Sequence, residues 1–117
     1  MAEPYARWHQ AVLAVAFLTR LPVARLLPAH IIPLNSAAWA FPLAGAVVGG
    51  AGAAVLAVAV GAGFPVLLAA LLALSAMILT TGGLHEDGLA DLADAAGGAT
   101  RERRLEIMRD SRIGSYG

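Results

Sequence analysis

Residues 37–60, AAWAFPLAGAVVGGAGAAVLAVAV, decide the fold, because they contain no charged side chain and are rich in Ala, Val, Leu and Gly. At the 1.5 Å rise of an α-helix, this stretch is long enough to cross a hydrocarbon core of roughly 30 Å. The composition agrees: 59% of the 117 residues are hydrophobic, against roughly 45–50% in soluble domains. We therefore predict a transmembrane helix here.

A second apolar run follows a group of helix breakers. Residues 61–65, GAGFP, combine glycine and proline and predict a turn. Residues 66–80 are apolar again, somewhat short for a crossing, but could be extended through Thr81-Gly82-Gly83. We expect the two runs to form a transmembrane helical hairpin.

Charge is confined to the two ends of the chain, since no formally charged residue lies between Arg25 and Glu86. Two crossings would bring all the arginines to one side of the membrane, which the positive-inside rule makes cytoplasmic. The net charge of zero gives no reason to expect a nucleic-acid partner. The chain has no cysteine, which excludes a disulfide framework and a thiolate nucleophile.

The remaining membrane features leave alternatives open. The apolar run at residues 11–18 is too short to span, so we expect an interfacial or re-entrant N-terminal helix. Gly45 and Gly49 have the small-xxx-small spacing that allows close helix packing, including in a homo-oligomer. Trp8 and Trp39 could anchor at the lipid interface or serve in ordinary packing.

These observations predict an all-α, polytopic helical membrane protein. We expect a single membrane-embedded region, with residues 1–36 interfacial or re-entrant, 37–81 a helical hairpin and 82–117 an active-site segment at the cytoplasmic face.

The segment after the hairpin is acidic. If it is helical, Asp87, Asp91 and Asp94 fall at i, i+4 and i+7 and share one face. A divalent cation would compensate this stripe of like charge, and Mg²⁺ prefers such oxygen ligands together with phosphate. The alternative is a solvated acidic turn neutralised by nearby arginines. His85 could carry a proton or contact phosphate, or be a structural histidine.

Residues 100–109 predict an amphipathic helix capped by Thr100, with Leu105, Ile107 and Met108 as core. Its arginines could face solvent, lipid headgroups or substrate. Residues 110–117, DSRIGSYG, form either a plain surface turn or a loop that approaches a phosphate, with Arg112 as a bidentate fork.

Two blocks, GGLHEDGLAD at 82–91 and RRLEIMRDSRIGSYG at 103–117, resemble the cobalamin synthase (adenosylcobinamide-GDP ribazoletransferase) family, as do FLTRLPV at 17–23 and WAFPLAG at 39–45. The resemblance implies that a hydroxyl of α-ribazole, or of its 5′-phosphate, replaces GMP on adenosylcobinamide-GDP, with Mg²⁺ as cofactor. It also implies the inner membrane of a prokaryote. Because family members are about twice as long, we expect an N-terminal half.

On this resemblance we assign the site residues by role. The catalytic residues are His85, as general base, with Asp87 and Asp91. The metal ligands are Asp87, Asp91 and Asp94, and the substrate-binding residues are Arg109, Asp110, Ser111 and Arg112. One departure is Asp94-Ala95, where the family usually has Asp-Gly, so a turn there with positive φ would be strained.

Two other functions compete. A CDP-alcohol phosphotransferase also sets aspartates at i+4 spacing on a membrane helix, but its motif requires Ala-Arg after Asp-Gly, where this chain has Leu89-Ala90-Asp91. A divalent-cation carrier would need carboxylates inside the crossings, and residues 37–80 contain none.

Overall fold

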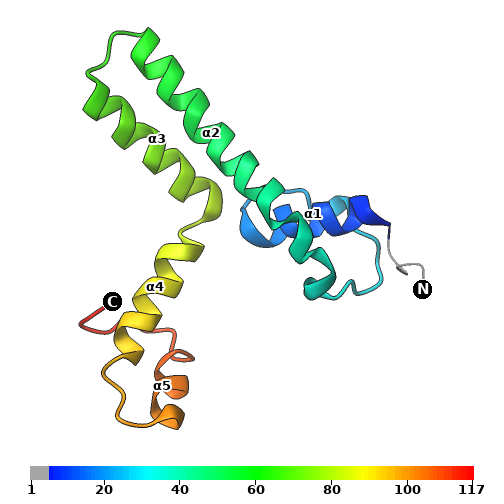
Figure 1. The fold of residues 1–117 in the computed structure, drawn as a ribbon, viewed down its shortest axis with the longest axis vertical. Helices are drawn as coiled ribbons and strands as arrows, with labels where there is room; N and C mark the ends of the chain where they lie inside the picture. The colour runs from blue at the N-terminus through cyan, green and yellow to red at the C-terminus, as the bar shows by residue number, and fades with distance from the viewer. Residues whose placement is uncertain (1–5) are drawn as a thin grey trace. The chain divides into compact units, whose positions relative to one another are not determined.

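The computed structural model describes residues 6–117, and every regular element in that part of the chain is helical. The chain divides into two compact units, which meet in sequence between Gly82 and Gly83. The first unit holds α1 (Arg7–Leu18), the 3₁₀ helices η1 (Ala24–Leu26) and η2 (Leu34–Ala40), α2 (Phe41–Gly61) and α3 (Val66–Thr81). The second holds α4 (Leu84–Ala95) and α5 (Arg101–Ile107) (Figure 1). The predicted all-α class is confirmed.

The first predicted crossing is confirmed as a helix. Together, η2 and α2 form a helical stretch, Leu34–Gly61, of 28 residues, which among the described residues is the one helix long and apolar enough by itself to cross a membrane. Pro42 lies in the first turn of α2, where its missing N–H would have had no partner within the helix.

The helical hairpin is also confirmed, and its second helix stops before Gly82-Gly83. The turn is closed by the N–H of Phe64, which donates to the carbonyl of Ala59 at 3.0 Å, and α2 and α3 then run side by side in opposite directions (Figure 1). The end of α3 agrees with the predicted hairpin of residues 37–81, and the further extension through Gly83 that the sequence left open does not form. The helix ends at Thr81 after 16 residues, because Gly82 and Gly83 adopt φ values of +71° and +75°, which a right-handed helix does not allow.

Small side chains let α2 and α3 approach, but not at the predicted glycines. A Cβ atom on Gly52 would lie 2.8 Å from both Cγ and Sδ of Met77 and 3.5 Å from the carbonyl oxygen of Ala73. Among the described residues, and apart from the backbone of the same helix turns, no atom lies within 4 Å of a Cβ placed on Gly45 or Gly49. The glycine that permits the helix contact is therefore Gly52, and an oligomer contact through Gly45 and Gly49 stays a prediction.

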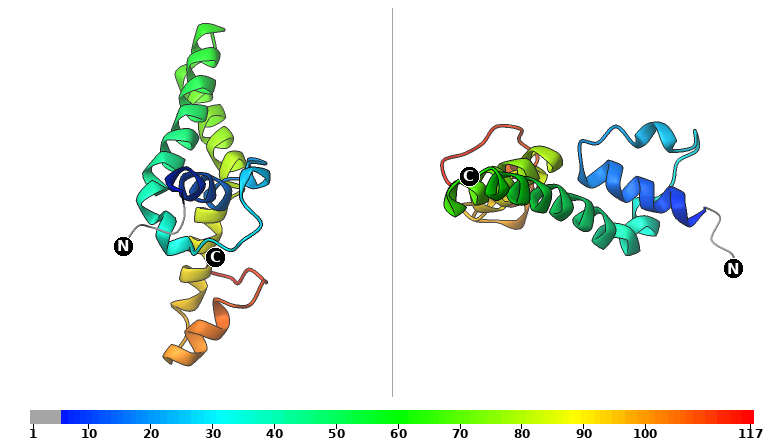
Figure 2. Two further views of the ribbon diagram at one scale, coloured as in Figure 1. Left: turned by 90° about the vertical axis from the view of Figure 1, so that its right-hand side faces the viewer. Right: turned by 90° about the horizontal axis from the view of Figure 1, so that it is seen from above.

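The N-terminal helix α1 packs beside the start of α2 (Figure 2). A buried alanine cluster, formed by Ala14 of α1 and by Ala37 and Ala40 of η2, joins α1 to the 3₁₀ helix that precedes α2. Gln10 is only 1% exposed, and its Oε1 accepts a 2.6 Å hydrogen bond from Nε1 of Trp39. The guanidinium carbon of Arg7 lies 5.4 Å from the centre of the Trp39 ring. Trp39 thus has a packing role, and an interfacial position for α1 stays a prediction.

Candidate functional site

The end of the hairpin is fixed by residues 19–21, which follow α1. The hydroxyl of Thr19 donates to the carbonyl of Val15 at 2.6 Å and accepts from the N–H of Leu21 at 3.3 Å. The N–H of Arg20 donates to the carbonyl of Thr80 at 2.8 Å, in the last turn of α3. The stem of Arg20 also covers Gly82 so closely that a Cβ atom there would collide with its Cγ and Cδ. The 17–23 block is therefore in contact with the end of α3 and with Gly82.

The predicted acidic segment is a helix. Because α4 spans Leu84–Ala95, Asp87, Asp91 and Asp94 lie on one face through their helical spacing. Asp87 belongs to the first turn, where a negative charge is stabilised by the helix dipole. His85 and Asp87 are exposed, whereas Asp91 and Asp94 are partly buried.

The Asp94 carboxylate holds the end of the chain. It accepts three backbone hydrogen bonds, from the N–H of Gly114 at 2.6 Å, Tyr116 at 3.0 Å and Gly117 at 2.8 Å. The pKa of Asp94 is lowered because Gly117, followed by Gly114 and Tyr116, donates to the charged form, against a rise from desolvation. We name residues 113–117 the C-terminal loop.

The glycines of this loop are required by space. A Cβ atom on Gly114 would lie 2.5 Å from Oδ1 of Asp94, and one on Gly117 would lie 2.5 Å from Oδ2 and 2.9 Å from the carbonyl oxygen of Ala90. Neither glycine has positive φ. The loop was predicted to approach a phosphate closely, and in the structure its backbone approaches a carboxylate of the chain itself.

The predicted helix after Thr100 is confirmed, with an earlier end. The hydroxyl of Thr100 accepts from the N–H of Arg103 at 3.2 Å, and α5 ends at Ile107. Within the described chain the predicted core is wrong for Leu105 and Met108, which are 36% and 43% exposed. A seven-residue helix can turn only a narrow stripe inward, and Ile107 is the partly buried member.

The predicted phosphate fork, Arg112, is already paired. Its Nε and Nη2 donate to the two oxygens of Asp110 at 3.1 and 2.8 Å, and its backbone N–H donates to the same carboxylate at 3.0 Å. The side-chain bonds, then the backbone bond, lower the pKa of Asp110 from 3.8 to about 2. The same side-chain bond raises the pKa of Arg112.

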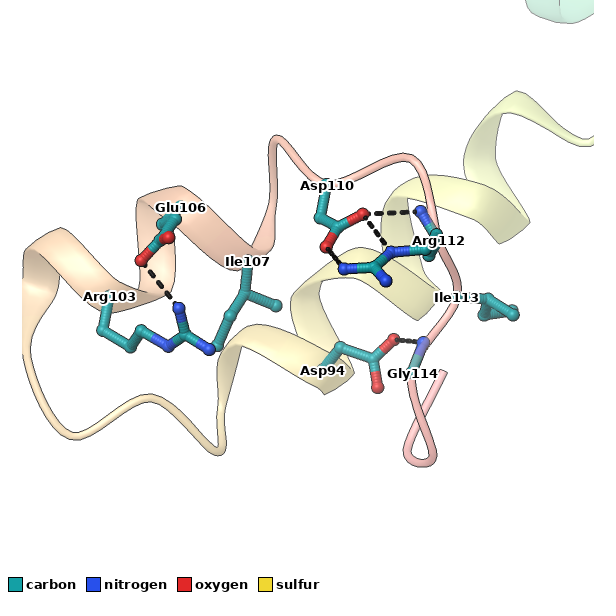
Figure 3. A pocket seen from close by; sticks show the side chains of 8 residues that line it. All are labelled: Asp94, Arg103, Glu106, Ile107, Asp110, Arg112, Ile113 and Gly114. Carbon is teal, nitrogen blue, oxygen red and sulfur yellow. Dashed lines mark hydrogen bonds and ion pairs between the residues drawn. The ribbon is translucent and has the colours of Figure 1, made fainter.

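A cavity of about 370 Å³ brings part of the predicted site together (Figure 3). Of the predicted residues, Asp94, Asp110 and Arg112 line it, whereas His85, Asp87, Asp91, Arg109 and Ser111 do not. The rest of the lining is Arg103, Glu106, Ile107, Ile113 and Gly114.

Sequence reasoning missed Glu106, Ile107 and Ile113 as parts of this cavity and left open whether Arg103 faces solvent, lipid headgroups or substrate. Arg103 is ion-paired with Glu106 at 2.7 Å, and both residues line the cavity. A signal was present, because residues 103, 106 and 107 have the i, i+3, i+4 spacing of one helical face, and position 110 continues it.

The three residues predicted to bind a metal ion, Asp87, Asp91 and Asp94, all offer carboxylate oxygens. Within residues 6–117 no group of three or more His, Asp or Glu side chains is placed to hold a metal ion. Mg²⁺ is commonly bound by one or two protein carboxylates and completes its shell with water and phosphate. Asp87 and Asp91, one turn apart on α4, satisfy that smaller requirement, so the metal assignment stays a prediction.

The Asp94-Ala95 departure causes no strain. Both residues lie inside α4, and no residue other than glycine has positive φ in the described chain. Ala95 is 3% exposed, so its methyl group is packed. The positive-φ turn of this region lies instead at Gly82-Gly83.

The apolar hairpin and the acidic helix define the class of protein, an all-helical membrane protein. A family model described as cobalamin-5-phosphate synthase matches residues 10–117. The chain belongs to this family.

Curated relatives agree with the family match. The chain is 56% identical over 106 residues to an adenosylcobinamide-GDP ribazoletransferase of Bradyrhizobium diazoefficiens, which covers 90% of this chain and 41% of the relative. It is 50% identical over 107 residues to the protein of that name from Shewanella amazonensis, covering 91% and 41%. The chain thus spans about two fifths of the length of these relatives. No solved structure matches it.

Proposed function

We propose that this chain is part of an adenosylcobinamide-GDP ribazoletransferase that makes adenosylcobalamin or its 5′-phosphate. The observation that carries the proposal is the similarity itself, which at 56% identity covers 90% of the chain, while the family model covers residues 10–117 and so includes the acidic helix and the C-terminal loop. The family membership agrees with it.

The proposed reaction is a phosphoryl transfer. A ribose hydroxyl of α-ribazole, or of its 5′-phosphate, forms a bond to the phosphorus that carries the cobinamide. The bond from that phosphorus to the bridging oxygen breaks, and GMP leaves with the electron pair. The hydroxyl proton passes to a base, a role that we propose for His85, which is exposed at the start of α4.

We propose that Asp87 and Asp91 hold the Mg²⁺ ion. Their spacing by one helical turn, and the exposure of Asp87, support this pair. When bound, the ion would neutralise charge on the diphosphate and on the leaving GMP. Asp94, the third predicted ligand, directs both oxygens at backbone N–H groups, so we leave it out of the proposed ligand set.

The substrate phosphates are assigned to residues 109–112. Asp110 orients the guanidinium of Arg112 in the lining of the cavity, and guanidinium groups bind phosphate through two parallel hydrogen bonds. Arg109 and Ser111 flank this pair in sequence and are exposed, which leaves their side chains accessible to a ligand.

The membrane, the orientation in it and the oligomeric state are also proposals. We propose the inner membrane of a prokaryote, with residues 83–117 on the cytoplasmic side, because all eight basic residues lie outside the apolar hairpin. A homo-oligomer through Gly45 and Gly49 is compatible with their empty surroundings within this chain.

The alternatives are less well supported. The CDP-alcohol phosphotransferase motif is broken at residues 89–91. A divalent-cation carrier would need carboxylates inside the hairpin, and the hairpin contains none. The similarity to proteins named as transferases gives a carrier function no support.

The test is GMP release from adenosylcobinamide-GDP and α-ribazole by membranes that carry the full-length protein, with and without Mg²⁺. We expect Mg²⁺-dependent release, which Asp87→Asn and Asp91→Asn each abolish while membrane insertion is retained. The matched control is Glu86→Gln, which removes a neighbouring carboxylate that lies off the stripe and should keep turnover. Absence of GMP from the wild type overturns the proposed function, and full turnover in both aspartate variants removes them from it.

A further inference from the structure

We infer that Asp94 is a positioning residue, which holds the C-terminal loop in place as one wall of the cavity, and that it is not a ligand of the metal ion. The consequence for catalysis rests on the proposed function, whereas the contact between Asp94 and the loop does not. The inference comes from the three backbone hydrogen bonds that converge on one carboxylate from residues 114, 116 and 117.

The geometry requires a carboxylate at this position. Oδ2 accepts from Gly114, and Oδ1 accepts from both Tyr116 and Gly117. An asparagine has one acceptor oxygen and one NH₂ group, so its NH₂ group would take the place of either Oδ1 or Oδ2 and face a backbone N–H that also donates. Only an ionised carboxylate accepts all three N–H groups, and such charge-assisted bonds are shorter and stronger than neutral ones.

The loop sequence is matched to this acceptor. Gly114 and Gly117 have no room for a Cβ atom, since it would lie 2.5 Å from a carboxylate oxygen of Asp94 in each case. Their φ values are ordinary, so the requirement comes from the approach to Asp94. Gly114 and Gly117, on either side of Ser115 and Tyr116, therefore allow the backbone to approach the Asp94 carboxylate.

This contact shapes the cavity. Asp94, Ile113 and Gly114 all line it, together with side chains from α5 and the Asp110–Arg112 pair (Figure 3). Loss of the contact would release this wall and change the space in which Arg112 is held. Since Asp94 lies on the same helical face as Asp87 and Asp91, the acidic stripe divides into a pair available to a cation and a third member that organises the loop.

The first experiment needs no activity. Hydrogen exchange is read residue by residue in the full-length protein in nanodiscs, for the wild type, Asp94→Asn and Asp94→Ala. We expect exchange about tenfold faster or more at residues 114, 116 and 117 in Asp94→Ala, with a partial effect in Asp94→Asn. Gly114→Ala should release the same amides with the carboxylate retained. The matched control is Gly88→Ala, whose Cβ meets nothing within 4 Å and should leave loop exchange unchanged.

The second experiment separates positioning from metal binding. In GMP-release assays, Asp94→Asn and Gly114→Ala should raise the KM for adenosylcobinamide-GDP about tenfold and leave the half-saturating Mg²⁺ concentration unchanged. An unchanged loop exchange in Asp94→Ala overturns the inference, as does a Mg²⁺ requirement raised tenfold or more in Asp94→Asn but not in Gly114→Ala. If the wild type releases no GMP, the proposed function fails while the exchange result still decides the role of Asp94.

Discussion

The contact between Arg20 and Gly82 can be measured by comparing two adjacent glycines. Gly82 and Gly83 have nearly the same φ, +71° and +75°, so an alanine at either position carries a similar left-handed strain of about 1–2 kcal/mol. They differ in their surroundings, because a Cβ on Gly82 collides with the stem of Arg20 and a Cβ on Gly83 meets nothing within 4 Å. The difference between Gly82→Ala and Gly83→Ala therefore isolates the collision.

The size of that difference follows from what must move. Overpacking costs about 1–3 kcal/mol, and here the nearest atoms belong to a flexible, exposed side chain, which places the cost near the lower end. We expect Gly83→Ala to lose about 1–2 kcal/mol of unfolding free energy and Gly82→Ala about 2–3 kcal/mol. Arg20→Ala combined with Gly82→Ala should lose the Gly83→Ala value plus the loss of Arg20→Ala alone, since the obstructing stem is gone.

The assay is reversible unfolding in mixed micelles, followed by circular dichroism, with Arg20→Ala alone as the fourth corner of the double-mutant cycle. Equal losses for the two glycine variants would refute the reasoning. So would a double variant that is as unstable as Gly82→Ala with the Arg20→Ala loss added, because the two changes would then be independent.

Two further predictions concern one contact each. The carboxyl carbon of Asp110, followed by NMR, should titrate near its pKa of about 2, and Arg112→Ala should return that pKa towards 3.8. Because the folded pKa is depressed, the contribution of the ion pair to folding stability is full above the ordinary pKa and is lost as pH falls towards 2. An unshifted titration would contradict the ion pair. Gly52→Ala should be about 1–2 kcal/mol less stable than Gly49→Ala in detergent, because both gain helix propensity but only Gly52 faces Met77 at 2.8 Å; equal stabilities would show that the helices do not touch there.

The helices could be predicted from sequence because their signals are local. An uncharged apolar stretch, a Gly-Pro break and a Thr cap each act within a few residues, and these gave the hairpin and α5. The sequence left open whether the helix continues through Gly82-Gly83, because glycine adopts either sign of φ at little cost. In the structure Gly82 and Gly83 have positive φ, and Gly82 is covered by Arg20, which lies far away in sequence.

The cavity was only partly predictable for the same reason. Asp94 was singled out for its charge and its spacing from Asp91, both visible in sequence, but its partners lie 20 to 23 positions later. A carboxylate gives no local sign of whether it faces a cation or a set of backbone N–H groups. The glycines at 114 and 117 were noted as phosphate-loop ingredients, and the structure shows that the same close approach serves an internal anion.

The sizes of the electrostatic free energies show whether the three aspartates on one face of α4 require a metal ion. Like charges at i, i+4 destabilise a helix by only about 0.2–0.5 kcal/mol per pair, and the position of Asp87 in the first turn of α4 returns about 0.3–1 kcal/mol through the helix dipole. Asp94 is stabilised by three N–H donors. Repulsion along α4 therefore needs no cation to relieve it. The case for Mg²⁺ at Asp87 and Asp91 depends instead on the diphosphate chemistry that the relatives' name describes, so substrate-dependent Mg²⁺ binding is the measurement on which that proposal depends.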